Sequence, residues 1–314
     1  MTRRSTIGVV VAARDASATV AEALAGVAWQ RRSADEVVVV DDGSGDATAD
    51  VVASWVDRLP LTVVRRAAPG GPGVARNDGI ERLSTDLVVF LDADDVWLPD
   101  HLGVLETAWT DPCTVVSPTV ARWWPGRYLA PWTPPAAWRV APGEQYERLL
   151  VENFVFSGSL AACQAVRGVG GFAEGSASED WDLWLRLAGV GHRFVLAPGP
   201  TVLYRQGLST LSSDLQCIDG DIVVLSQVLR REPDARFRAV AERSLRDRRA
   251  RQAVARSATL AGSGRSLAAR MHALGGMAGR RRTRLLAAAS VVAPRAVDGW
   301  RRSGVSERLR RVGR

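Results

Sequence analysis

The chain contains no lysine: all 41 of its basic residues are arginine, and they stand against 34 acidic residues for a net charge of +7. We interpret this exclusive use of arginine as the codon preference of a GC-rich genome. Cysteine is also scarce. Cys113, Cys163 and Cys217 are far apart and lack the spacing of metal ligands. The sequence therefore predicts neither a disulfide framework nor a zinc site, and it favours a reducing compartment.

Long apolar runs are absent as well. A membrane-spanning helix needs about 18 or more consecutive apolar residues, and no segment reaches that length. The apolar run Ile7–Ala13 is followed at once by Arg14 and Asp15, so a strand explains it better than a signal peptide does. We therefore expect a cytoplasmic protein, either free or peripheral at the inner face of the plasma membrane.

Charge is divided unevenly along the chain. Residues 1–229 hold 18 arginines and 28 acidic residues, a net charge of −10, whereas residues 230–314 hold 23 arginines and six acidic residues, a net charge of +17. Helical spacing with glycine breaks near 262–264 and 275–276 predicts two or three helices in the basic segment. These helices could lie on an anionic membrane surface, or pack against the acidic remainder of the chain. No nucleic-acid-binding motif accompanies the arginines, so no nucleic-acid partner is expected.

The segment VVFLDADD at 88–95 runs from an apolar strand directly into three carboxylates. A continuous apolar run is typical of a parallel sheet covered on both faces, and ligands collect beyond the carboxyl ends of such strands. Crowded carboxylates raise one another's pKa unless a cation neutralises them. Magnesium-type ions are commonly held by one or two carboxylates and substrate phosphates. The segment predicts a metal-nucleotide site, with a plain acidic loop as the alternative.

Two earlier segments repeat the pattern of an apolar strand that ends in polar residues, at 7–13 and at 36–44 (EVVVVDDGS). Helix-like stretches at 18–30 and 47–56 separate the strands. This alternation predicts a right-handed series of strand-helix-strand units around a parallel sheet, with the acid-tipped strands sharing one edge. The predicted caps are a capping box from Thr19 to Glu22 for the first helix and Asp46 for the second.

Four short segments stand in order along the chain: Asp41–Ser44 (DDGS), Ala75–Ile80 (ARNDGI), Leu91–Asp95 (LDADD) and Ser178–Trp184 (SEDWDLW). Together they resemble the motif set of family 2 glycosyltransferases with the GT-A fold. The resemblance covers residues 5 to 215. It implies a Rossmann-like αβα sandwich with a mostly parallel central sheet as the catalytic domain, over 1–215, followed by a helical, arginine-rich extension over 216–314.

The resemblance also implies a reaction. A metal-dependent enzyme would move a sugar from a nucleotide-diphosphate sugar, with UDP favoured, to a hydroxyl of a carbohydrate or lipid-linked acceptor, in the synthesis of cell-envelope polysaccharide, glycolipid or glycoconjugate. Asp92 and Asp94 would hold Mg²⁺ or Mn²⁺, with Asp94 as the direct ligand and Asp95 as a loop cap. Asp180 would be the general base, and a base opposite the leaving diphosphate implies inversion. The residues expected to bind the nucleotide sugar are Ala13, Arg14, Asp41, Asp42, Arg76, Asp92, Ala93, Asp94, Glu179, Trp181 and Arg205.

Several of these assignments have a physical reason and a competing one. A carboxylate at Asp41 or Asp42 can accept the imide N–H of uracil or thymine, although guanine also offers donors. The planar donor fork of Arg76 matches diphosphate oxygens, although a surface salt bridge is the alternative. One of the two aspartates could instead cap its turn, and Asp180 could simply stabilise a helix N-terminus.

One departure from the family pattern affects the metal site. Many relatives carry Tyr-Arg-x-His near the end of the domain, whereas Tyr204 and Arg205 are followed here by Gln206 and Gly207. The missing histidine leaves metal coordination thinner and makes Arg205 a candidate diphosphate contact. A catalytically weak nucleotide-sugar-binding homologue or scaffold therefore stays open. A sugar-nucleotide pyrophosphorylase is disfavoured because it would need a catalytic lysine and an N-terminal G-x-G-T-R loop.

Two remaining segments bear on ligand choice. The glycines of Pro69–Gly73 do not follow a strand directly in the G-x-G-x-x-G register, which disfavours a Rossmann dehydrogenase.

Between the metal motif and Asp180, four tryptophans stand among prolines. Aromatic faces can stack on sugars, so this stretch is a candidate acceptor site, with core packing as the alternative for at least half of them. They are Trp123, Trp124, Trp132 and Trp138.

Overall fold

The computed structural model describes residues 4–124, 128–131, 136–175, 177–206 and 211–262. The chain divides into two compact units, residues 1–207 and residues 208–314. The predicted division at 215/216 falls inside a helix of the second unit.

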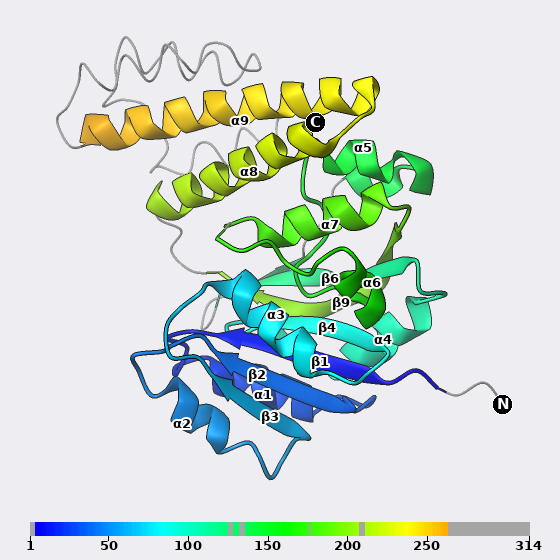
Figure 1. Ribbon diagram of the computed structural model, residues 1–314. Coiled ribbons are helices and arrows are strands. Elements are labelled where there is room, and N and C mark those ends of the chain that lie inside the picture. The colour runs from blue at the N-terminus through cyan, green and yellow to red at the C-terminus, as the bar shows by residue number, and fades with distance from the viewer. Residues whose placement is uncertain (1–3, 125–127, 132–135, 176, 207–210, 263–314) are drawn as a thin grey trace. The chain divides into compact units, whose positions relative to one another are not determined.

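In the described part of the first unit, the strands form one nine-stranded sheet (Figure 1). They are β1 (Ile7–Ala13), β2 (Glu36–Asp41), β3 (Leu61–Arg65), β4 (Leu87–Asp92), β5 (Val96–Trp97), β6 (Thr114–Trp124), β7 (Tyr128–Pro131), β8 (Leu160–Ala162) and β9 (Arg193–Arg205). Their order is β3-β2-β1-β4-β8-β6-β9-β5, with β7 paired to β6. The first four strands are parallel, as are β6 and β9, whereas β8, β5 and β7 run antiparallel to their neighbours. The predicted mostly parallel sheet is confirmed.

Helices cover both faces of this sheet. They are α1 (Val20–Ala28), α2 (Thr48–Ala53), α3 (Pro72–Arg82), α4 (His101–Ala108), α5 (Gln145–Leu149), α6 (Cys163–Gly168) and α7 (Glu179–Gly189), with 3₁₀ turns at Ala136–Arg139 and Pro142–Glu144. Successive strand residues point to opposite faces. Val9 and Val11 therefore pack in the cluster that includes Leu24 of α1, whereas Val10 meets α3 at Gly79. The result is the expected αβα sandwich.

The two predicted helix caps turned out differently. Thr19 precedes α1, but its hydroxyl donates to the carbonyl of Ala16 (3.4 Å) and caps no helix amide, so the predicted capping box is wrong. Asp46 accepts the amide of Thr48, the first residue of α2, at 3.0 Å. The second cap is thus formed, from the residue before the N-cap position.

The strand register brings the acid-tipped ends together. Ala13 pairs with Asp41, and Ala12 pairs with Asp92, on either side of β1. The carboxyl ends of β1, β2 and β4 therefore share one edge, as the sequence predicts. The valine-rich strands behind this edge are fully buried, so the sheet fixes where the polar residues that follow them begin.

The second unit contains α8 (Leu211–Arg231) and α9 (Ala235–Gly262), joined by a short loop (Figure 1). Arg248 on α9 donates to Asp221 on α8 (2.9 Å), and Gln252 donates to Asp219 (2.5 Å). These contacts join the two helices over neighbouring turns. The predicted glycine breaks near 262–264 and 275–276 fall at or beyond the end of the described residues. None of the helices described has the length and apolar character needed to cross a membrane.

Candidate active site

One buried arginine links the carboxyl end of β4 to the start of α7. Arg76, on α3, donates to Asp92 Oδ1 (2.6 Å) and to Glu179 Oε1 (2.5 Å), and its Cζ lies 5.2 Å from the centre of the Phe172 ring. Burial alone would lower the pKa of Arg76, but Asp92 and Glu179 raise it above its usual value, so the guanidinium stays charged. Two motifs far apart in the sequence are thereby held in one site.

Asp42 holds the glycine-rich loop in place. Its two carboxylate oxygens accept the amides of Gly70 (2.8 Å) and Gly71 (2.7 Å), and Arg66 pairs with it at 2.9 Å. Gly71 has a φ of 91°, a left-handed conformation that favours glycine, and it is the last residue before α3. Asp42 therefore fixes the start of the helix that carries Arg76.

Asp41 has different surroundings. It is fully buried, and its Oδ1 accepts the amide of Ser44 at 3.0 Å. Its Oδ2 has no hydrogen-bond partner among the described residues and lies 3.6 Å from Nε of Arg65. A buried acceptor atom without a donor is costly, and of the two aspartates only Asp41 has such an atom, because loop amides occupy both oxygens of Asp42.

The loop after β4 presents one exposed and one buried aspartate. Asp94 is exposed, and desolvation together with the charge of Asp92 raises its pKa. Asp95 is buried and accepts the backbone amide of Arg205 at 2.9 Å, which makes it the loop cap that the sequence predicts. Burial and the nearby Asp92 raise the pKa of Asp95 to about 8.

Arg205, at the end of β9, contacts this loop with its side chain. Its Nε donates to the carbonyl of Asp94 (2.7 Å), and its guanidinium pairs with Glu22 on α1. Its Cζ also lies 4.3 Å from the ring centre of Trp123. Arg205 therefore lies beside the predicted metal ligand, with its charge already balanced by Glu22.

Asp180 is the second residue of α7. Its Oδ2 accepts a hydrogen bond from Asn153 Nδ2 (3.2 Å), and its Oδ1 accepts the amide of Trp181 (2.7 Å). Desolvation, and then the charge of Glu179, raise the pKa of Asp180 to about 6. A carboxylate with this pKa can take up a proton near neutral pH, as a general base must. Trp181 is buried and donates through Nε1 to the carbonyl of Leu149 (2.9 Å), so its role in the structure is to anchor α7.

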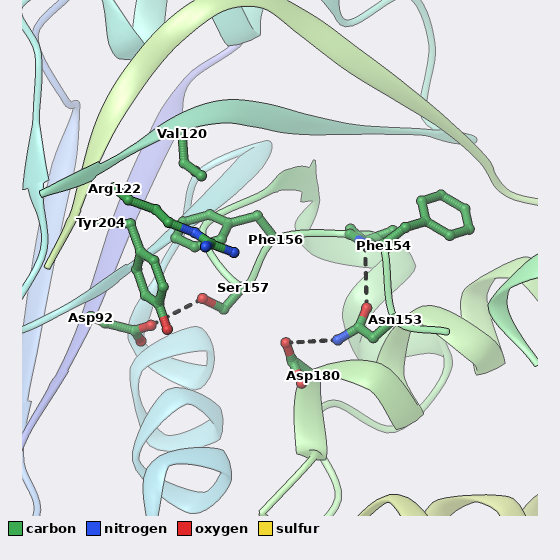
Figure 2. Close-up of a pocket in the computed structure, with 10 residues that line it drawn as sticks. Asp92, Val120, Arg122, Asn153, Phe154, Phe156, Ser157, Asp180 and Tyr204 are labelled. Carbon is green, nitrogen blue, oxygen red and sulfur yellow. Dashed lines mark hydrogen bonds between the residues drawn. The ribbon is translucent and has the colours of Figure 1, made fainter. Parts of the chain in front are cut away.

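A pocket with a volume of about 270 Å³ lies between Asp92 and Asp180 (Figure 2). Its wall is formed by Val120 and Arg122 on β6, Tyr204 on β9 and the loop 153–157. Ser157 donates to Asp92 Oδ2 (3.0 Å), and Asn153 donates to Asp180, so the same loop contacts both acids. The pocket thus joins the metal motif to the predicted base.

Sequence reasoning missed most of the wall of this pocket. Asn153, Phe156 and Ser157 lie in an irregular loop whose place depends on tertiary contacts, such as the hydrogen bond from the Phe156 amide to Ser117 Oγ (3.1 Å). Arg122 stands next to two tryptophans, and no motif of the resembled family includes it. The available signal was that Arg122 is the one charged residue in the segment that forms β6.

The four tryptophans of the predicted acceptor stretch do not share one environment. Trp123 packs under Arg205, and Trp138 packs edge-to-face on Phe154 with ring centres 4.9 Å apart. Trp124 ends β6, whereas Trp132 and Gly207 lie outside the described residues. Neither Trp123 nor Trp138 lines the pocket, so packing within the domain explains the positions of both.

The other predicted donor contacts stand apart from the pocket. Ala13 and Ala93 are buried at the ends of β1 and β4, and Arg14 is exposed and lies 3.6 Å from Asp15. None of them lines the pocket, and neither do Asp41 and Asp42. The strand edge therefore offers two neighbouring regions, one at the tips of β1 and β2 and one between Asp92 and Asp180.

The residues present fit a hard cation only in part. Within the described ranges, no group of three or more histidine, cysteine or acidic side chains converges on one point. Mg²⁺ and Mn²⁺ need few protein carboxylates when substrate phosphates complete their coordination. Asp94 offers an exposed carboxylate oxygen. Burial and the negative charge of Asp92 raise the pKa of Asp94, and a bound cation would offset the repulsion between the two carboxylates. Asp94 therefore suits a cation that arrives with a diphosphate, whereas both oxygens of Asp92 already accept hydrogen bonds, from Arg76 and from Ser157.

The sequence matches the family model "Glycosyl transferase family 2" over residues 8–166. Succinoglycan biosynthesis protein ExoW of Rhizobium meliloti (strain 1021) is 45% identical over 84 residues, which is 26% of this chain and 26% of that protein. The putative teichuronic acid biosynthesis glycosyltransferase TuaG of Bacillus subtilis (strain 168) is 39% identical over 69 residues, 21% of this chain and 27% of that protein. Matches to these curated relatives thus span about a quarter of their length.

Solved structures resemble the chain over nearly its whole length. S. aureus TarS 1–349 in complex with UDP-GlcNAc superposes with a TM-score of 0.60 at 17% identity, over 95% of this chain and 92% of that one. Mannosyltransferase PcManGT from Pyrobaculum calidifontis, in complex with GDP-Man and Mn²⁺, gives a TM-score of 0.61 at 20% identity, over 95% and 88%. These likenesses confirm the GT-A fold.

Proposed function

The chain belongs to glycosyl transferase family 2, and from that premise we propose that it transfers a sugar from a nucleotide-diphosphate sugar to an acceptor hydroxyl, with inversion at the sugar carbon. The observation that supports this most is the pocket with Asp92 at one end and Asp180 at the other. Inverting transfer needs a leaving diphosphate on one side of the sugar and a base on the opposite side. The pocket provides room for a sugar between them.

Asp180 is the proposed general base. Its pKa of about 6 suits removal of a hydroxyl proton at neutral pH, and Asn153 orients its carboxylate. Arg76 pairs with the neighbouring Glu179 and so fixes the start of α7, the helix that carries the base. Single displacement follows, because the base acts on the acceptor and no side chain needs to attack the donor.

Asp92 and Asp94 are the proposed ligands of Mg²⁺ or Mn²⁺. When bound, this ion would act as a Lewis acid that stabilises the negative charge of the leaving diphosphate. The neighbouring structure PcManGT contains Mn²⁺ and GDP-Man, which supports a metal-bound donor of this kind. Arg205 lies beside the same loop. It would contact the diphosphate only if its ion pair with Glu22 were replaced by one with a phosphate oxygen.

The nucleotide is proposed to bind at the tips of β1 and β2, near Ala13, Arg14 and Asp41. The unpartnered Oδ2 of Asp41 can accept an imide N–H, which favours UDP as the carrier. TarS was solved with UDP-GlcNAc, in agreement with this choice, whereas PcManGT was solved with GDP-Man. The acceptor is proposed to be a carbohydrate or lipid-linked sugar of cell-envelope polysaccharide synthesis, because ExoW and TuaG are named for succinoglycan and teichuronic acid.

Metal-stimulated nucleotide binding tests the proposal. UDP would be titrated into the full chain by calorimetry with and without Mn²⁺. The wild type should bind UDP more tightly with Mn²⁺, and Asp94→Ala should lose that gain while its thermal unfolding stays unchanged, because Asp94 is an exposed loop residue. Asp57→Ala, at another exposed aspartate, is the matched control. An equal Mn²⁺ effect in Asp94→Ala and wild type would remove Asp94 from the metal site.

A second candidate is a catalytically weak nucleotide-sugar-binding homologue. Gly207 in place of the family histidine, and the engagement of Arg205 by Glu22, favour it. Such a protein would bind UDP. Its rate of UDP release from UDP-sugars would be no higher than that of an Asp180→Asn variant. Turnover that depends on Asp180 would exclude it.

A further inference from the structure

Arg122 occupies a distinctive position on β6. Val120 and Arg122 point to the same face of the strand, into the pocket, whereas Trp123 points to the other face and packs under Arg205. In the register between β6 and β9, Arg122 is paired with Tyr204, which also lines the pocket. Backbone pairing to β7 on the other side fixes the strand as well. The guanidinium is therefore placed in the pocket by the sheet itself.

Arg122 differs from the other arginines of the site in having no counter-charge. Arg76 is paired with Asp92 and Glu179, and Arg205 is paired with Glu22. Arg122 forms no hydrogen bond or ion pair with any residue that the structure describes. A sugar that fills the pocket would take water away from this cation. That loss is costly unless the sugar brings an acceptor for it.

The carboxylates of the pocket do not meet this need. Asp92 is neutralised by Arg76 and also accepts from Ser157. Asp180 is held by Asn153, and Figure 2 shows these two residues on the opposite side of the pocket from Arg122 and Tyr204. Arg122 itself is exposed, so its guanidinium is available to a ligand that enters the pocket.

The position of Arg122 indicates which part of the ligand it meets. The tips of β1 and β2, where the nucleotide is proposed to bind, do not line the pocket. A volume of about 270 Å³ is below the ~300–1,000 Å³ typical of pockets for drug-sized ligands, and it suits a single sugar ring. Figure 2 shows the Arg122 side chain extending toward the middle of the pocket, between Asp92 and Asp180, where the donor sugar would lie under the proposed function.

We propose that Arg122 is a specificity-determining residue that selects a donor whose sugar carries a carboxylate, that is, a nucleotide-activated hexuronic acid. This inference rests on the proposed function of the pocket. A guanidinium and a carboxylate form two parallel hydrogen bonds of matching geometry, which the hydroxymethyl group of a neutral hexose cannot do. Phe156 and Tyr204, packed edge-to-face with ring centres 5.6 Å apart, supply the apolar wall for the ring.

Paired donors test the proposal in the full chain. Affinities for UDP, UDP-glucose and UDP-glucuronic acid would be measured by calorimetry with Mn²⁺, together with GDP-mannose and GDP-mannuronic acid. The wild type should bind the uronic acid of one pair about tenfold or more tighter than its neutral partner, the usual strength of a charge-assisted hydrogen bond. Arg122→Gln should abolish that preference and leave the affinity for UDP or GDP alone unchanged. Arg122→Lys keeps the positive charge but loses the two parallel N–H donors of the guanidinium, so it should retain part of the preference for the uronic acid.

The other outcomes are distinct from one another. Equal affinity for both members of each pair in the wild type would overturn the proposal, although UDP binding would still support the proposed function. Weaker binding of UDP itself to Arg122→Gln would assign the arginine to the diphosphate and overturn the proposal too. Failure of every nucleotide to bind would overturn both. Arg58→Gln, at an exposed arginine outside the pocket, should behave as wild type.

Discussion

At the scale of single residues, Asp180 is the most direct test of the chemistry. Asp180→Asn keeps the shape of the side chain and can still accept the hydrogen bond from Asn153, so UDP affinity should be unchanged. Loss of the base should reduce UDP release from the donor by about 10² to 10⁴, the usual contribution of general-base catalysis. Glu174→Gln, in the exposed loop before α7, is the control. Wild-type turnover in Asp180→Asn would move the role elsewhere.

The pH dependence of this reaction follows from the same residue. A base works only when deprotonated, and the pKa of Asp180 is raised from 3.8 to about 6. The rate should therefore rise with pH through about 6 and level off above it, with a loss of about tenfold per unit below. In Asp180→Asn the residual rate should no longer rise with pH near pH 6. A wild-type profile flat from pH 5 to 8 would contradict the assignment.

The motif residues could be predicted from the sequence, and several of their neighbours could not. Asp92 and Asp180 stand in short segments with strong local patterns. Their pairing through Arg76 depends on how α3 and α7 pack, which no local pattern records. The same limit explains the failed capping box at Thr19: its hydroxyl found a nearer acceptor in Ala16.

At the scale of elements, the approach of α3 to β1 depends on Gly79. A Cβ at this position would lie 2.4 Å from Cγ1 of the buried Val10, closer than atoms can approach. Gly79→Ala should therefore push α3 outward and lower the free energy of unfolding by about 1–3 kcal/mol, the range seen for overpacked cores. It should also weaken UDP binding with Mn²⁺, because Arg76 is one turn away on the same helix.

Urea denaturation would measure the cost of this substitution against a matched glycine. In Gly168→Ala the added Cβ, at the end of α6, meets nothing within 4 Å, so its stability should equal or slightly exceed that of the wild type. If Gly79→Ala were as stable as Gly168→Ala, the tight packing of α3 on β1 would not be what positions Arg76.

Strands differed in how well the sequence revealed them. The apolar runs of β1, β2 and β4 are long and end in acids, so both their existence and their shared edge were predicted. The antiparallel β8 was not, because the three residues Leu160–Ala162 are too few to show a period. Yet β8 lies between β4 and β6 and thereby sets the distance between Asp92 and Arg122 across the sheet.

At the scale of the whole molecule, the charge boundary and the structural boundary do not coincide. The net charge changes sign near residue 230, but α8 and α9 are tied by Arg248 and Asp221 across that point. A chain ending at Gly207 should unfold cooperatively and bind UDP like the full chain, because the sheet and the candidate site lie within residues 1–207. Thermal unfolding and calorimetry would check both.

The same pair of chains tests whether the basic segment contacts a membrane surface, one of the two alternatives that the sequence leaves open. The full chain should sediment with vesicles containing phosphatidylglycerol, and this binding should weaken with salt, since exposed charges are screened beyond ~10 Å at 0.1 M. The chain ending at Gly207 should stay in the supernatant. Equal sedimentation of the two would reject the anchor, and aggregation of the shorter chain would favour the packing alternative.

Arg76 acquires its two partners at different times during synthesis. Asp92 follows it by 16 residues and Glu179 by 103. At a synthesis rate of about 5–20 residues per second, the ribosome needs roughly 5 to 20 s to reach Glu179. Until then, burial of the guanidinium would leave it with only one of its two partners, which is unfavourable. The buried ion pairs of Arg76 are therefore complete only after α7 has been synthesised, when most of the catalytic unit already exists as nascent chain.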